Sequence, residues 1–150
     1  MTGKREIVLG PGEGRQFKLV RDTTMLSKAR GDDTGGAYSL QEFDAPPHVT
    51  TSAHVHPNAE QAFYVLTGVL AFQLGERVMH APAGSFILIP RGMPHAFWNP
   101  ESETATYITI FSPAGPERWF EEMGERLAAG ESLDGAANRE LARKYGTEFP

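Results

Sequence analysis

The sequence predicts an all-β fold, a sandwich or barrel of short strands, that ends in two helices. Three observations predict it. Glycine and proline account for 16 and 11 of the 150 residues and occur in short groups that punctuate the chain. Between these turns lie short runs rich in β-branched and aromatic residues. In the last third of the chain, apolar residues recur instead at helical spacing.

The strands are expected where β-branched and aromatic residues lie between turn residues. The expected strands are 16–21, 37–43, 61–67, 69–74, 85–90 and 104–112. Their spacing is typical of a sandwich or barrel. A chain of this length buries a single core, so we expect one domain over residues 1–150, with the barrel over about 15–112.

The first helix is expected to begin near Pro116, since proline suits the first turn of a helix. Its apolar face would consist of Trp119, Met123 and Leu127. A second, shorter helix is expected over about 135–145, with Asp134 as its N-cap. The helical region, about 116–146, is expected to pack on the outside of the barrel.

Composition excludes several classes of function. The chain has no cysteine, which rules out disulfides, thiolate metal sites and cysteine nucleophiles. With 14 basic and 19 acidic residues its net charge is −5, and it has no basic cluster for nucleic acid or an anionic membrane. No apolar run approaches the roughly 20 residues that span a bilayer. We therefore expect a cytoplasmic protein with a small-molecule partner and neither nucleic-acid nor membrane partners.

Two segments carry residues suited to metal binding. His54 and His56 lie two residues apart, so on a strand both imidazoles would point to the same face and could converge on one ion. The second segment runs from Gly84 to Asn99, and its glycines and proline turn the chain so that His95 starts the next strand.

These segments resemble the two signature motifs of the cupin superfamily, G-x5-H-x-H-x3-4-E-x6-G and G-x5-P-x-G-x2-H-x3-N. The second motif is matched at every fixed position. The first has both histidines and the closing Gly68, but His48 replaces its opening glycine. Other stretches look like small single-domain, quercetin 2,3-dioxygenase-like cupins: 8–14, 34–40, 90–95 and 112–120. The resemblance implies a double-stranded β-helix (jelly-roll) barrel, and a homodimer.

The resemblance also implies a divalent transition metal (iron, manganese, nickel, copper or zinc) held by His54, His56 and His95. In cupins with the full set, a glutamate of the first motif is the fourth ligand. Counting back from Gly68 places Gln61 at this position, while Glu60 falls one residue early. If Phe63 and Val65 fill the interior, Gln61 shares their side of the strand. A bulge would instead turn Glu60 inward. We expect Gln61 inside, with Glu60 as the alternative ligand.

The function implied first is a metal-dependent, dioxygenase-like (quercetinase-type) oxidoreductase acting on a small oxygenated aromatic or polyketide-like compound. The resemblance to quercetinase-like enzymes implies that a glutamate at this position deprotonates the substrate hydroxyl, and a glutamine cannot take a proton at neutral pH. Two alternatives therefore stay open. One is a non-redox cyclase or isomerase of a biosynthetic pathway on the same scaffold, and the other is a metal-free cupin that binds a small ligand.

Aromatic and apolar residues that could face the histidines are candidates for the substrate pocket, although core packing is the default role of each. The candidates are Phe63, Phe97, Phe72, Tyr38 and Met93. His48 and His80 are expected to be solvated. Asn99 is expected to hold a turn by backbone hydrogen bonds. Trp119 and Phe120 are expected to anchor the first helix to the barrel or to another subunit.

Overall fold

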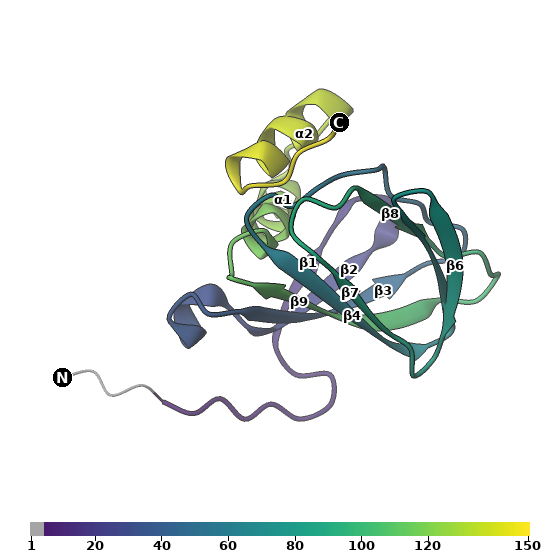
Figure 1. The fold of residues 1–150 in the computed structure, drawn as a ribbon. Helices are drawn as coiled ribbons and strands as arrows, with labels where there is room; N and C mark the ends of the chain where they lie inside the picture. The colour runs from purple at the N-terminus through teal and green to yellow at the C-terminus, as the bar shows by residue number, and fades with distance from the viewer. Residues whose placement is uncertain (1–4) are drawn as a thin grey trace.

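The computed structural model describes residues 5–150, which form two antiparallel sheets and two helices (Figure 1). The strands are β1 (Arg15–Lys18), β2 (Thr24–Ala29), β3 (Ser39–Ala45), β4 (Glu60–Thr67), β5 (Val69–Leu74), β6 (Arg77–Pro82), β7 (Phe86–Ile89), β8 (His95–Trp98) and β9 (Ala105–Ser112). The helical elements are η1 (Val20–Asp22), η2 (Gly31–Thr34), α1 (Glu117–Ala128) and α2 (Gly135–Lys144).

The larger sheet has the strand order β1-β2-β3-β9-β4-β7, and the smaller one has the order β6-β5-β8. The predicted all-β fold with two C-terminal helices is confirmed. Over residues 5–150 the strand ladders make two separate sheets rather than one closed ring. Two strands, β2 and β6, were not predicted. Strand β6 is a mostly exposed edge strand that ends in proline, so its sequence lacks the usual apolar signal. The sequence of β2 has a weak preference for strand conformation, and its hydrogen-bonded pairing with β1 and β3 overrides this preference.

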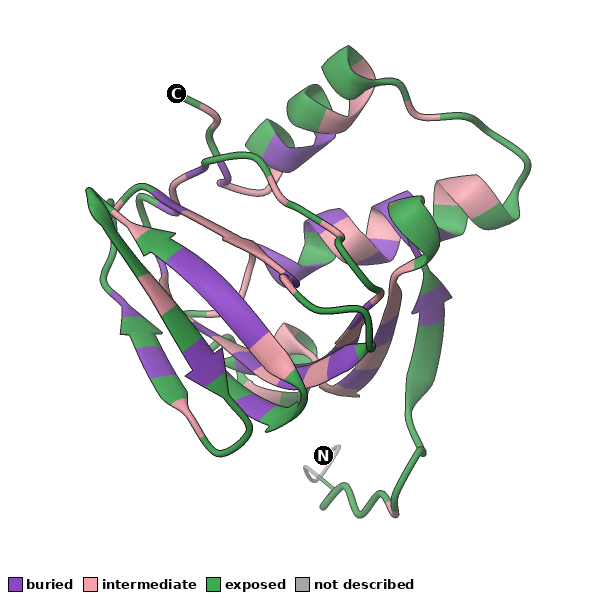
Figure 2. Cartoon of the chain, turned by 90° about the vertical axis from the view of Figure 1, so that its right-hand side faces the viewer, coloured by how far each residue is buried: buried purple, intermediate pink, exposed green. Residues whose placement is uncertain are grey.

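The core lies between the inner faces of the two sheets. Along β4 the inward residues Gln61, Phe63 and Val65 are buried, whereas Tyr64 is exposed. Figure 2 shows the same alternation of buried and exposed positions on other strands. The ring of Phe63 contacts that of Phe72 on β5 edge to face, with centroids 5.0 Å apart, which joins the two sheets. Burial of each such side chain contributes about 1.5–3 kcal/mol.

Helix α1 packs on β1, and the contact needs a small residue. A Cβ at Gly124 would lie 2.9 Å from the Cβ of Phe17. Trp119 and Met123 are buried, as the helical spacing predicts. Helix α2 begins at the predicted cap, because Asp134 Oδ1 accepts a hydrogen bond of 2.7 Å from the Ala137 amide. Neither helix, nor any other helical segment within residues 5–150, is both long and apolar enough to cross a membrane.

The segment after α2 returns to the sheets and lies beside the first histidine motif. The amide of Val55 donates to the carbonyl of Glu148 at 2.8 Å, and the amide of Glu148 donates back at 3.0 Å. This short antiparallel bridge brings the C-terminal residues next to His54 and His56. The C-terminal region is thus part of the surroundings of the candidate site.

Candidate metal centre

Three buried histidines converge at one end of the two sheets. His54 and His56 precede β4, and His95 is the first residue of β8. Each offers a ring nitrogen, and these nitrogens all lie within 4.8 Å of one another. The backbone itself enforces the meeting, because His54 and His95 exchange two amide–carbonyl hydrogen bonds of 3.0 Å. The two predicted motifs therefore meet side by side.

The outer nitrogen of each imidazole has a hydrogen-bond partner that orients the ring. Nδ1 of His54 lies 2.8 Å from the carbonyl oxygen of Ser52, and Nδ1 of His95 lies 3.0 Å from that of Met93. Nδ1 of His56 lies 3.0 Å from the hydroxyl oxygen of Thr147. A neutral imidazole that donates from Nδ1 carries its lone pair on Nε2. This is the arrangement of metal-binding histidines, whose other nitrogen is held by a carbonyl or another polar group.

Burial keeps the three imidazoles uncharged at neutral pH. It lowers the pKa of His54, and it lowers the pKa of His56 to about 3 and that of His95 to about 4. In His56 the neighbouring His54 and His95 lower the pKa further, since a second positive charge in the cluster is unfavourable. No proton has to leave before these nitrogens can bind a metal ion.

The structure places Gln61, and not Glu60, beside the histidines. Gln61 is buried, and its Oε1 lies 3.1 Å from His95 Nε2. Glu60 faces the other side of β4, where an oxygen of its carboxylate lies 3.7 Å from a guanidinium nitrogen of Arg91. The alternation along β4 thus operates without a bulge at this point. An amide oxygen can bind a metal ion, but it brings no charge and no basic site.

The residues present fit a metal ion. His56 Nε2 is buried and has no hydrogen-bond partner within residues 5–150. Leaving such an acceptor unpaired costs about 1–3 kcal/mol, and coordination to a cation would remove that cost. Imidazole donors suit zinc, copper, iron and nickel, and an added amide oxygen is compatible with the same ions.

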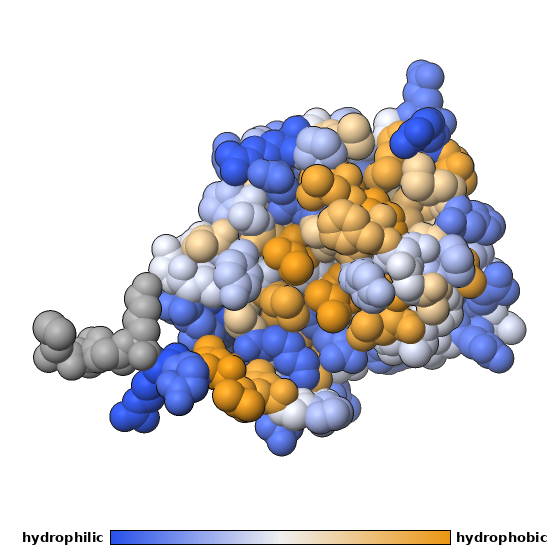
Figure 3. All heavy atoms as spheres, turned by 60° about the horizontal axis from the view of Figure 1, so that its bottom comes forward, coloured by the Kyte–Doolittle hydropathy of each residue, from blue (hydrophilic) through white to orange (hydrophobic). Residues whose placement is uncertain are grey.

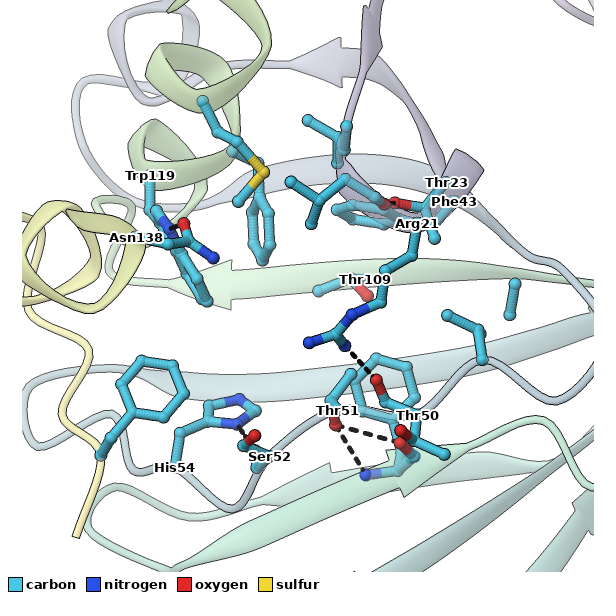
Figure 4. Close-up of a pocket in the computed structure, with 18 of the residues that line it drawn as sticks. Arg21, Thr23, Phe43, Thr50, Thr51, Ser52, His54, Thr109, Trp119 and Asn138 are labelled. Carbon is cyan, nitrogen blue, oxygen red and sulfur yellow. Dashed lines mark hydrogen bonds between the residues drawn. The ribbon is translucent and has the colours of Figure 1, made fainter. Parts of the chain in front are cut away.

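A cavity of about 190 Å³ adjoins the histidines (Figure 4). His54, His56 and Gln61 form part of its wall. Most of the remaining wall is apolar or aromatic and includes Val49, Phe43, Phe97, Tyr107, Trp119, Phe120, Met123 and Phe149. Thr109 also lines the cavity, and its buried hydroxyl has no partner among the described residues. The site therefore combines a largely apolar surface with polar and charged side chains, as ligand sites do.

The candidate pocket residues separate into lining and non-lining positions. Phe97 lines the cavity. Phe63 and Phe72 do not; they are almost fully buried against each other. Phe63 is on the expected side of β4 but two residues beyond Gln61, which carries it about 6–7 Å further into the core. Tyr38 is exposed and lies outside the cavity. Met93 contributes its carbonyl to His95 while its side chain packs on the core.

Residues from the C-terminal third complete the site, and sequence reasoning missed most of them. Trp119 and Phe120, expected only to anchor the helix, line the cavity, so α1 does not pack simply on the outside. The indole of Trp119 is fixed by a hydrogen bond of 2.9 Å from Nε1 to Asn138 Oδ1 (Figure 4). Phe149 lines the cavity and Thr147 contacts His56. Trp119 and Phe120 near the start of α1 were the one sequence signal for this part of the cavity wall. Residues 145–150, which follow α2, carry no periodic pattern.

The other motif positions have structural roles. His48, at the position of the motif glycine, has φ 61°, a left-handed conformation that glycine adopts easily. His48 and His80 are both exposed, as expected. The side-chain amide of Asn99 donates to the carbonyls of Ala45 and Glu103 at 2.9 and 2.8 Å, so the predicted turn-holding role is confirmed.

Comparison with known proteins agrees with this architecture. The model of the cupin domain family matches residues 41–111, which contain all three histidines. No curated protein sequence gave a significant match. Among solved structures, the polyketide cyclase RemF from Streptomyces resistomycificus is 24% identical with a TM-score of 0.64, over 72% of this chain and 80% of that one.

Two further solved structures share the fold at lower identity. KdgF from Halomonas sp. is 15% identical with a TM-score of 0.64, over 75% of this chain and 97% of that one. A predicted oxalate decarboxylase from Thermotoga maritima is 15% identical with a TM-score of 0.64, over 71% and 99%. The chain thus has the cupin fold, and its residues 41–111 match the cupin domain family.

Proposed function

We propose that the protein is a metal-dependent enzyme that cyclises or isomerises a small oxygenated aromatic or polyketide-like compound without net oxidation. The observation that carries the proposal is the wall of the cavity. His54, His56 and the amide of Gln61 line a largely apolar and aromatic cleft, and the candidate ligand set of three neutral histidines and Gln61 contains no carboxylate. The likeness to a polyketide cyclase supports the same class of substrate.

His54, His56 and His95 would hold the metal ion, with Gln61 Oε1 as a further ligand. A divalent ion bound there supplies Lewis-acid polarisation of a substrate oxygen. The Nδ1 contacts of the histidines keep the donor nitrogens aimed at one point, so the site is organised before substrate enters.

The protein's own side chains would position the substrate. Phe43, Phe97 and Phe149 present ring surfaces against which a planar compound can stack while water is excluded. Burial raises the pKa of the Tyr107 phenol, so Tyr107 stays protonated and can donate a hydrogen bond to a substrate oxygen. The unpartnered hydroxyl of Thr109 is a second polar contact. Holding a flexible chain in a reactive conformation is the main contribution such a cleft can make.

Dioxygenase-like oxidation is the second candidate function. Imidazole donors also suit the iron, copper and nickel ions of oxygen chemistry, which favours it. Against it stands Gln61, whose amide cannot take the proton that the resemblance to quercetinase-like enzymes assigns to a glutamate at this position.

Product mass and oxygen dependence distinguish the two candidates. Metal-reconstituted protein is incubated with enolisable aromatic ketones and flavonols, with and without oxygen, and the products are analysed by mass spectrometry. A cyclase or isomerase gives a product of unchanged mass, or one lighter by water, in both atmospheres. Products that gain dioxygen and form only in air would overturn the proposal in favour of oxidation.

Paired variants of this assay test the role of the metal site. His95→Ala should abolish turnover, whereas Glu60→Gln, which changes the neighbouring outward-facing residue, should leave it unchanged. Turnover that survives His95→Ala would show that the histidine cluster is not the reactive centre.

We also propose that the protein is a homodimer. The outer surface of β4 and β7 exposes Tyr64, Leu66, Phe86 and Leu88, and Tyr64 and Phe86 are register partners. In the view of Figure 3, hydrophobic atoms form a broad band across the surface. Contiguous apolar surface of this kind is uncommon on monomers. Sedimentation velocity should give the mass of a dimer, and of a monomer for Phe86→Lys but not for Val78→Lys on β6. A monomeric wild-type protein would contradict this.

A further inference from the structure

Two arginines line the same cavity as the histidines. Arg21 belongs to η1 and Arg139 to α2. Figure 4 shows the side chain of Arg21 reaching into the cavity toward Thr50. Its guanidinium donates a hydrogen bond to the carbonyl of Thr50.

The backbone that presents Arg21 is strained. Arg21 has φ 59° and ψ 34°, and Asp22 has φ 56°, so two consecutive residues other than glycine lie in the left-handed region. Each such residue costs about 1–2 kcal/mol. The turn is held by hydrogen bonds of 2.8 Å from the Leu19 amide to the Thr23 carbonyl and from the Thr23 hydroxyl to the Val20 carbonyl. Strain that the surrounding structure maintains in this way is a feature of functional sites.

Arg21 and Arg139 line the cavity and are both exposed to solvent. Within residues 5–150, neither arginine forms an ion pair with a carboxylate. The hydrogen bond to Thr50 uses one of the five N–H donors of Arg21. Among the residues that line the cavity Asp44 is the one carboxylate, and it already accepts a hydrogen bond from the Thr24 amide. A chain of net charge −5 thus builds a cavity with more positive than negative groups.

We propose that the substrate is an aromatic carboxylate and that Arg21 is the residue that selects it. The carboxylate would pair with the free N–H groups of Arg21, a geometry that guanidinium favours. The ring would stack on Phe43 and Phe97, and the reacting oxygen would face the histidines. Apolar cavities of about 150 Å³ hold benzene, so about 190 Å³ with an open mouth suits one or two rings.

The inference rests on the proposed function, because it assumes that a small molecule occupies this cavity. Its test is a binding measurement that needs no turnover. The probes are 2-naphthoate and the isosteric neutral 2-naphthamide, and binding is followed by calorimetry and by tryptophan fluorescence in a Trp98→Phe background, where Trp119 in the cavity wall is the remaining tryptophan. The protein is first freed of metal with EDTA, because a bound ion could itself attract the carboxylate.

Wild-type protein should bind naphthoate up to about fivefold more tightly than naphthamide, since an ion pair with an exposed arginine contributes about 0.2–1 kcal/mol and 1.4 kcal/mol is tenfold. Arg21→Gln should remove this preference while leaving naphthamide affinity unchanged, and Arg21→Lys should retain part of it. Arg77→Gln, which removes an exposed arginine of β6 that does not line the cavity, should have no effect. Circular dichroism and a thermal melt verify that each variant is folded.

Equal affinity of the wild-type protein for the two probes, no detectable binding of naphthoate, or an unchanged preference in Arg21→Gln would each overturn the inference. The outcome is separable from that of the proposed function. If the carboxylate preference depends on Arg21 but His95→Ala does not impair turnover or metal binding, the metal proposal fails and the role of Arg21 stands. If metal binding is intact but the preference is absent, the reverse holds.

Discussion

Lowering the pH should destabilise the metal-free protein through its histidine cluster. Burial lowers the pKa of His56 to about 3 and of His95 to about 4 from an ordinary value of 6.5. The folded state therefore binds protons at these sites less readily than the unfolded chain. For such a group the stabilising contribution is fully present above pH 6.5 and is lost as the pH falls toward the folded-state pKa.

The magnitude follows from the two pKa values of each group. Between pH 7 and pH 5 the unfolded chain gains protons that His56 and His95 do not take up in the folded state. With 1.36 kcal/mol for each pKa unit, each histidine removes about 2 kcal/mol from the free energy of unfolding over this range. His54, whose pKa burial also lowers, adds to the loss in the same direction. A total of several kcal/mol is a large part of the stability of a small domain.

Urea unfolding of EDTA-treated protein at several pH values measures this loss. Carboxylates also titrate near pH 5, so the informative quantity is the difference between the wild-type protein and His56→Gln or His95→Gln, which are neutral at every pH. Each variant should lose about 2 kcal/mol less than wild type between pH 7 and pH 5. A loss that is equal in wild type and variants would refute the reasoning, because the histidines would then titrate normally in the folded state.

Three further predictions concern single residues. Thr147→Val should lower metal affinity about 10- to 100-fold because it removes the hydrogen bond that orients His56, whereas Thr147→Ser should preserve the affinity. Competitive titration with a chelator measures both, and a Thr147→Val protein that binds metal as tightly as wild type would contradict this orienting role. Gln61→Glu should raise metal affinity about tenfold or more, since a carboxylate adds charge beside the ion; unchanged affinity would place Gln61 outside the coordination sphere. Gly124→Ala should lower the free energy of unfolding by about 1–3 kcal/mol, because the added Cβ would clash with Phe17 and this outweighs the better helix propensity of alanine. Thermal or urea unfolding measures the change, and a stabilised variant would show that α1 can shift freely.

Local rules in the sequence, together with the resemblance to the cupin motifs, located the candidate metal site. The i, i+2 spacing of His54 and His56 predicted that both imidazoles face one ion, the resemblance to the cupin motifs added His95, and the structure brings all three together. The alternation along β4 was enough to distinguish Gln61 from Glu60, since side chains on a strand change face at every residue.

The cavity could not be predicted in the same way. How far a residue lies from the open end of the cavity, and which distant segments pack around it, leave no pattern in a short stretch of sequence. Alternation assigns Phe63 to the inner face but does not say how far from the open end it lies. The contact between His56 and Thr147 joins residues 91 positions apart, and the bridge from Val55 to Glu148 is of the same kind. Such contacts depend on how α1 and α2 dock, which short-range sequence patterns do not determine.

A metal titration tests most directly whether His54, His56 and His95 together bind a metal ion. Zinc or cobalt is added to EDTA-treated protein and binding is followed by calorimetry, with the cobalt absorption spectrum as a report on the ligands. We expect one ion per chain in the wild-type protein and in Glu60→Gln, and at least tenfold weaker binding in His54→Ala, His56→Ala and His95→Ala. Absence of stoichiometric binding, or binding that the histidine variants leave unchanged, would contradict the account.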